Sequence, residues 1–187
     1  MKINKENVVE AYNVADGNGK KMLEALFGAD TFTRPDNRSI EERIKTFDDA
    51  VKELGYEHPL VRTYLSVINE CKDIDERLDA YLQLRIICAA LNEGWEPKFT
   101  ENEWRYHPWF CLYTGKEIAE KKDIRLIVIS DRYETEYEGF GYACPFNIPS
   151  NAAAVSDASL CLKDASLAAY CGKQFIDIWA DYLLIRK

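Results

Sequence analysis

The sequence predicts an α+β fold: an N-terminal helical half of about five helices packs on a small, mainly antiparallel three-stranded sheet, followed by a long C-terminal helix. Three observations predict it. Through the first 94 residues, apolar side chains recur at helical spacing between capping residues. One β-branched run, residues 124–129, is typical of a buried strand. An amphipathic segment that begins after an aspartate closes the chain.

Five helical segments are expected before residue 95. Ser39 and Glu42 form a capping box, and Gly55 ends the helix that follows. The longest helix begins at Asp73 or Asp75, and its apolar residues cover more than one face, so we expect it to pack on several sides. The helices are predicted at about residues 4–13, 20–27, 40–54, 59–71 and from 73 or 75 to 94.

The second part of the chain is predicted to supply three strands, at 124–129, 136–146 and 160–162. Thr114 caps a short polar helix over 115–122 before the first of them. Asp164 caps the long closing helix. Its apolar positions for the core are Leu167, Cys171, Phe175, Ile178, Trp179 and Tyr182.

The length of 187 residues and the 47% hydrophobic content suit one core, so we predict a single domain over residues 1–187. It divides into a helical half at about 1–94, an aromatic connector at 95–113 and a mixed half at about 114–187. The connector holds three of the four tryptophans and shows neither helical nor strand periodicity. We expect it to join the helices to the sheet.

The charge of the chain bears on its partners and location. A net charge of -8, spread over both halves, disfavours nucleic acid as a partner because phosphate binding needs a basic excess. No apolar run approaches the roughly 18 residues that span a bilayer, so no membrane partner is expected. The N-terminal residues lack the apolar core of a secretory signal. The sequence therefore predicts a cytoplasmic protein.

The chemistry-bearing residues give little support for catalysis. The six cysteines form no Cys-x-x-Cys pair, so no metal ligand is predicted and the thiols are expected to be reduced. Phosphate-binding and nucleophile-elbow glycine motifs are missing, and no cofactor is predicted. We name no catalytic residue and do not expect an enzyme.

Two clusters admit competing interpretations. His107 precedes a proline and is interpreted first as a structural turn residue, then as a ligand contact, and last as a base. Glu134, Glu136 and Glu138 lie on one side of a predicted strand, which favours a solvated face over an acid and base pair.

The aromatic connector is the predicted recognition element. We expect Trp95 and Trp109 to be packed between helix and sheet, so that Trp109→Ala would cost roughly 3–5 kcal/mol. Trp104, among polar and charged neighbours, is expected to be more exposed, and Trp104→Ala to weaken recognition with little loss of stability. The aromatic residues of the connector, together with nearby cations, would form a stacking platform for a planar ligand. The rings are Trp95, Trp104, Tyr106 and Trp109, and the cations are Lys98, Arg105 and Arg132.

Four segments resemble an uncharacterised family of small proteins encoded by tailed phages and prophages of gut anaerobic bacteria. The resemblance spans roughly residues 20–185 and implies a phage or prophage origin and a setting in the bacterial host cytoplasm or the virion, without an activity. Near the end, Lys163 matches the family pattern, while Ser159 stands where that pattern has an arginine. The segments are IEERIKTF at 40–47, ALNEGWEP at 90–97, YHPWF at 106–110 and AYCGKQF at 169–175.

Two main functional hypotheses follow. The first is a non-enzymatic accessory binding protein that recognises a small ligand or a protein partner through an aromatic-lined site. The second is a phage structural or assembly protein that uses the aromatic surface for homo-oligomer contacts. Single-stranded nucleic-acid binding ranks third. The candidate ligand-binding residues are Trp104, Arg105, Tyr106, His107, Arg132, Tyr133, Tyr137 and Lys163.

Overall fold

A computed structural model describes residues 8, 11–12, 14–28, 38–71, 73–98, 100, 102–120, 126–149 and 158–187. They fall into two compact units, within Met1–Arg38 and within Ser39–Lys187. The first unit contains α2 (Gly17–Phe27), which begins where the Asp16 carboxylate accepts a hydrogen bond from the Gly19 N–H. The helix predicted at 4–13 lies mostly outside the described residues.

The second unit opens with α3 (Ile40–Arg43) and α4 (Phe47–Leu54), so the single helix predicted over 40–54 is wrong. The capping box at Ser39 is confirmed. Thr46 forms a second one, in which its hydroxyl accepts from the Asp49 N–H and the Asp49 carboxylate accepts from the Thr46 N–H. Because that cap requires extended backbone, the first helix ends before it and α4 begins after it.

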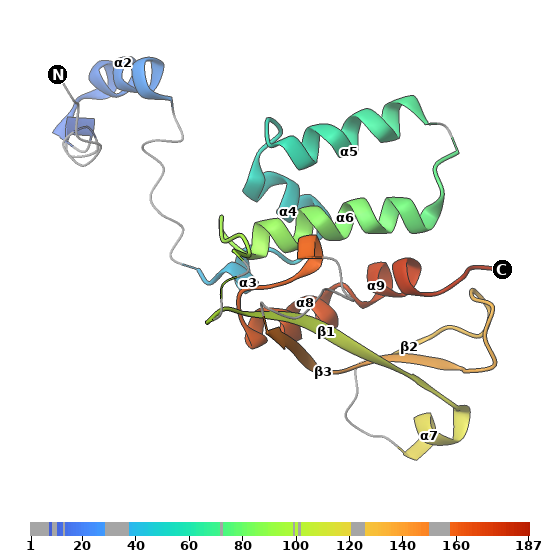
Figure 1. The fold of residues 1–187 in the computed structure, drawn as a ribbon. Helices are drawn as coiled ribbons and strands as arrows, with labels where there is room; N and C mark the ends of the chain where they lie inside the picture. The colour runs from blue at the N-terminus through green and yellow to red at the C-terminus, as the bar shows by residue number, and fades with distance from the viewer. Residues whose placement is uncertain are drawn as a thin grey trace. The chain divides into compact units, whose positions relative to one another are not determined.

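Helices α5 (Pro59–Glu70) and α6 (Glu76–Leu91) follow, and both starting points are confirmed. Asp75 caps α6 through the Leu78 N–H. As expected from its broad apolar circumference, α6 contacts α4, α5 and α9 (Ile176–Leu183), and it is the central helix of the unit (Figure 1). Its fully buried residues include Leu84, Ile87 and Cys88.

The sheet has three antiparallel strands, as predicted, in the order β1 (Trp104–Tyr113), β3 (Gly139–Pro149), β2 (Leu126–Val128). One of the three predicted strands is wrong. The strand predicted at 160–162 is instead the 3-10 turn η2 (Ala158–Leu160) followed by a single bridge from Leu162 to Tyr106. The missing strand, β1, comes from the aromatic connector.

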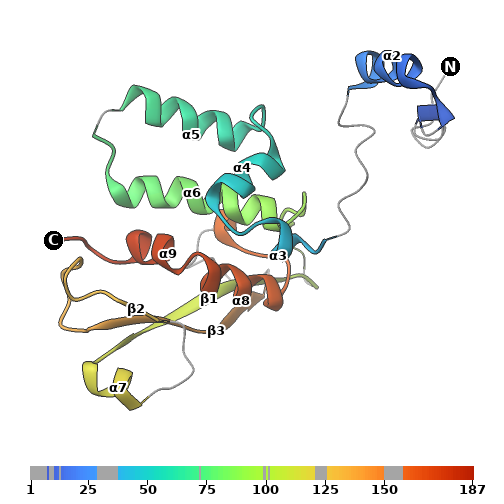
Figure 2. The same ribbon diagram turned by 180° about the vertical axis from the view of Figure 1, so that it is seen from behind.

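Two helices cover one face of the sheet, α8 (Ala165–Gln174) and α9, so the single long C-terminal helix is wrong. The Asp164 cap is confirmed. The helix breaks at Phe175, whose backbone leaves the helical region at φ −111°, ψ 32° while its ring is buried in the core. Figures 1 and 2 show α8 and α9 on one side of the sheet and α7 (Gly115–Glu120) on the other.

Aromatic rings fill the space between the sheet and α9. Phe110 of β1 stacks on Phe140 of β3 with ring centroids 4.7 Å apart, and it packs against Trp179 of α9 at 5.6 Å. Trp179 is only 4% exposed. The Glu134 N–H donates to the carbonyl of Ile185, which ties the C-terminal segment to the loop between β2 and β3. None of the helices in the described ranges is long and apolar enough to cross a bilayer.

Candidate functional site

The two faces of the β1–β3 ribbon differ in what covers them. A Cβ added at Gly172 of α8 would lie 2.6 Å from Pro108 and from the Tyr142 ring, so these residues point toward α8. Trp109 lies between the inward-facing Pro108 and Phe110, and alternation turns it to the opposite face. On that face a Cβ at Gly139 would meet Ile118 of α7, so α7 covers one end of it.

Trp109 and Phe146 form an exposed ring pair on this outer face. Their centroids are 5.3 Å apart with planes tilted by 49°, and the side chains are 51% and 42% exposed. Cys144 stands directly opposite Trp109 in the ladder and is exposed, and Cys111 lies one alternation further along β1. We call Trp109, Cys111, Cys144 and Phe146 the outer patch.

The outer patch lacks charge. Of the 10 residues of β1 and the 11 of β3, only Arg105 carries a full charge, whereas 30% of the whole chain is charged. Arg105 is fully buried, so its guanidinium is not presented at the surface. Strands with exposed faces and edges normally carry charged residues that discourage association. A ribbon that presents no charge at its surface and carries two half-exposed rings is therefore a candidate contact surface.

The predicted burial of Trp109 is wrong, and so is the cost of 3–5 kcal/mol that followed from it. The tryptophan that packs between helices and sheet is Trp179. Trp104 is 48% exposed, in agreement with its expected exposure, but it lies five positions before Trp109 along β1, an odd offset that places it on the other face of the ribbon. Five residues of strand also separate the two by roughly 17 Å.

Two other candidate ligand-binding residues of β1, Tyr106 and His107, are packed within the fold. Tyr106 is partly buried against the core, and its backbone exchanges two hydrogen bonds with Leu162, at 3.1 and 2.8 Å. His107 is buried within β1 opposite Phe146, so it belongs to a strand and not to the turn that was its leading interpretation.

Arg132, Tyr133 and Tyr137 lie in the segment between β2 and β3. Tyr133 is fully buried and donates a 2.5 Å hydrogen bond to Asp181 of α9; burial, followed by this contact, raises the pKa of its phenol to about 12. The Arg132 guanidinium lies 5.4 Å from the Tyr133 ring centre and contacts Asp177 of α9. Tyr137 is 42% exposed. The contacts described for Arg132 and Tyr133 thus fix the loop to α9.

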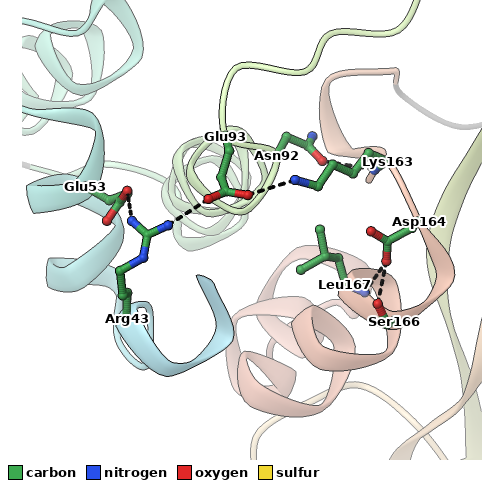
Figure 3. A network of polar contacts seen from close by, with 8 residues as sticks. All are labelled: Arg43, Glu53, Asn92, Glu93, Lys163, Asp164, Ser166 and Leu167. Carbon is green, nitrogen blue, oxygen red and sulfur yellow. Dashed lines mark hydrogen bonds and ion pairs between the residues drawn. The ribbon is translucent and has the colours of Figure 1, made fainter. Parts of the chain in front are cut away.

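Lys163 lies in a polar network at the end of α6 (Figure 3). Its ammonium contacts Glu93 at 2.9 Å, and Glu93 also accepts from Arg43 at 2.7 Å; Arg43 in turn contacts Glu53 of α4. The buried Asn92 amide donates to the carbonyl of Cys161 at 2.9 Å, and its oxygen accepts from the Lys163 N–H at 3.0 Å. The network joins three segments that are distant in sequence.

Glu93 is held in this network at a backbone φ of 50°, in the left-handed region that non-glycine residues rarely adopt. The hydrogen bond and charge of Lys163, with help from Arg43, lower the pKa of its carboxyl below the ordinary value of 4.5. A left-handed residue at the end of a helix turns the chain sharply. Here that turn brings the carboxylate between two cations.

Glu93→Gln is expected to lower the free energy of unfolding by up to about 1 kcal/mol at pH 7, because the paired side chains are partly exposed and screened by solvent. A lowered folded-state pKa stabilises the protein above the unfolded pKa, and this stability is lost as pH falls through the folded value. The deficit of the variant should therefore shrink between about pH 5 and pH 3. Urea unfolding across this range tests it, and a pH-independent deficit would contradict the ion-pair origin.

Within the described ranges, no group of three or more histidine, cysteine, aspartate or glutamate residues could hold a metal ion. Comparison with protein-family models, with curated proteins and with solved structures returned no match. The candidate site therefore stands on its geometry alone.

Sequence reasoning missed Phe146 and Cys144 as surface residues and misplaced Trp109. A usable signal was present: residues 142–149 contain no charged side chain, and neither do residues 106–113. Two such stretches in a chain with 30% charge indicate strands whose surface avoids water or meets a partner.

Proposed function

We propose that this chain is a non-enzymatic binding protein that docks a protein partner through the outer patch, in the phage or prophage setting that the sequence resemblance implies. The observation that carries the proposal is the Trp109–Phe146 pair, two large apolar rings half exposed on an uncharged sheet face. Tryptophan and other aromatic residues dominate the energetic centres of protein interfaces, because each buries a large area at low entropic cost.

The form of the patch favours a protein surface over a small ligand. Small-molecule sites enclose most of the ligand in a concave pocket. Trp109 and Phe146 instead lie side by side on one face of a two-stranded ribbon, where a broad partner would cover both rings together. The patch is thus suited to an apolar segment or face of another polypeptide.

Single-stranded nucleic acid fits the patch less well. Stacking platforms for bases work beside cations that track the phosphate backbone. The ribbon supplies no surface cation, because its one arginine, Arg105, is buried. The net charge of -8 adds repulsion at longer range.

The test uses the double variant Trp109→Ser/Phe146→Ser and a displayed library of random peptides. Wild type is expected to select apolar, aromatic-containing peptides, and the double variant to lose at least about tenfold in affinity for them, as for the loss of an interface anchor. Tryptophan fluorescence and isothermal titration would measure the affinities.

Trp104→Ser is the matched control, because Trp104 is the same residue type with nearly the same exposure but lies on the other face. It should retain peptide binding within about twofold. Peptide binding that is lost in the control and kept in the double variant would move the site to the other face and defeat the proposal.

A further inference from the structure

We infer that the partner seated on the outer patch is a second copy of this chain, related to the first by a two-fold axis that passes through the patch. The inference rests on the proposed function, since it names the occupant of the same surface. It makes Trp109 and Phe146 of one copy contact the same residues of the other.

The charge pattern carries the argument. Near a two-fold axis every group faces its own copy, so any charged side chain there would meet a like charge. Residues 143–147, Ala-Cys-Pro-Phe-Asn, are exposed and uncharged, and so is Trp109 beside them. In a chain of net charge -8, such a surface lets two copies meet without bringing like charges together at the axis.

A basic protein as the partner would not explain the lack of charge on the outer patch. A basic protein would gain from acidic residues around the contact, since complementary charges steer encounter and fix the register. The strands that carry the outer patch have no acidic residue. An uncharged, aromatic surface is instead complementary to itself.

The size of the patch sets the expected strength. The whole ribbon of 10 paired residues is about 33 Å long and roughly 10 Å wide, but α7 covers one end of its outer face and Arg105 and His107 are buried near the other, so the patch offers less than about 300 Å² per copy. Stable interfaces bury about 800 Å² per partner. We therefore expect a weak, reversible dimer that forms at micromolar or higher concentration and needs a trapping method.

Cys144 allows the weak dimer to be captured by covalent cross-linking. It is exposed within the patch, opposite Trp109, so a two-fold axis through the patch brings the Cys144 thiols of two copies together. A short bis-maleimide added to the reduced full-length protein should link the copies through this residue. Cys71 is also exposed but follows α5, away from the ribbon, and serves as the internal control.

In a Cys111→Ser background, which removes the other thiol of the outer patch, the expected result is a covalent dimer that persists with Cys71→Ser and is lost with Cys144→Ser. Trp109→Ser/Phe146→Ser, which retains Cys144, should give at least about tenfold less linked dimer. Linkage through Cys71, linkage that survives the double substitution, or no linked dimer at high protein concentration would each overturn the inference.

The salt dependence of association distinguishes a second copy of this chain from a basic partner. Raising the salt from about 0.1 M to about 1 M shortens the screening length from ~10 Å to ~3 Å and weakens the repulsion between two copies of charge -8. Self-association measured by sedimentation equilibrium should therefore strengthen. Weakening with salt would overturn the inference.

The two proposals fail in different ways. A chain that remains monomeric, while peptides still bind in a manner that needs Trp109 and Phe146, overturns the second copy and leaves the proposed function standing. If neither self-association nor peptide binding depends on these two side chains, both are overturned.

Discussion

Trp179→Ala is expected to lower the free energy of unfolding by about 3–5 kcal/mol. The indole is 4% exposed and lies between the sheet and the helices, with its ring 5.6 Å from Phe110 and 6.1 Å from Tyr182. Truncation removes these contacts and leaves a cavity that the closely packed neighbours fill only in part. Urea unfolding followed by circular dichroism measures the loss.

Two variants of the same experiment control for ring chemistry and position. Trp179→Phe keeps most of the buried ring and removes an indole N–H that has no acceptor among the described residues, so its cost should fall well below that of alanine. Trp109→Ala removes the same residue type from a half-exposed position and should cost no more than about 1.5 kcal/mol. Equal costs at positions 179 and 109 would contradict the assignment of core and surface.

Asn92→Ala is expected to cost about 2–4 kcal/mol, a large loss for one polar side chain. The amide satisfies two backbone groups at once, the carbonyl of Cys161 and the N–H of Lys163. Its removal leaves both desolvated without a partner, at roughly 1–3 kcal/mol each before water compensates. The same urea unfolding measurement would report the loss.

Asn92→Asp tests whether both bonds are needed. The carboxylate still accepts from the Lys163 N–H, but its second oxygen faces the Cys161 carbonyl where a donor is required. At pH 7 this variant should therefore also be clearly destabilised. If the free energy of unfolding of both variants is within about 0.5 kcal/mol of wild type, water replaces the two hydrogen bonds. The contact between the end of α6 and residues 161–163 would then not depend on Asn92.

The helix starts were predictable because each depends on one side chain close in sequence. Ser39 and Asp164 cap the helices expected of them, and Asp75, one of the two caps expected for the longest helix, caps α6. The interruptions were not predicted. Thr46 competes as a second cap within one apolar pattern, and the non-helical backbone at Phe175 accompanies a ring buried in the core, which depends on tertiary packing.

The strand β1 and the outer patch escaped prediction for a related reason. A proline within a run of residues restricts it to an edge strand or argues against a strand, because it has no N–H for the ladder. Here Pro108 stands opposite Pro145, so the two residues without a donor occupy one rung and the ladder continues on both sides. That compensation lies 37 residues away and is invisible to local periodicity. With β1 read as a connector, the alternation that turns Trp109 outward could not be applied.

The two hydrogen bonds of the Asn92 side chain also have a consequence for folding during synthesis. Its two partners, Cys161 and Lys163, follow it by 69 and 71 residues. At a synthesis rate of about 5–20 residues per second, the chain needs roughly 4–14 s to reach them. During that interval Asn92 lacks both partners, because neither Cys161 nor Lys163 has been synthesised. The two hydrogen bonds of Asn92 can therefore form only after residue 163 has been added to the chain.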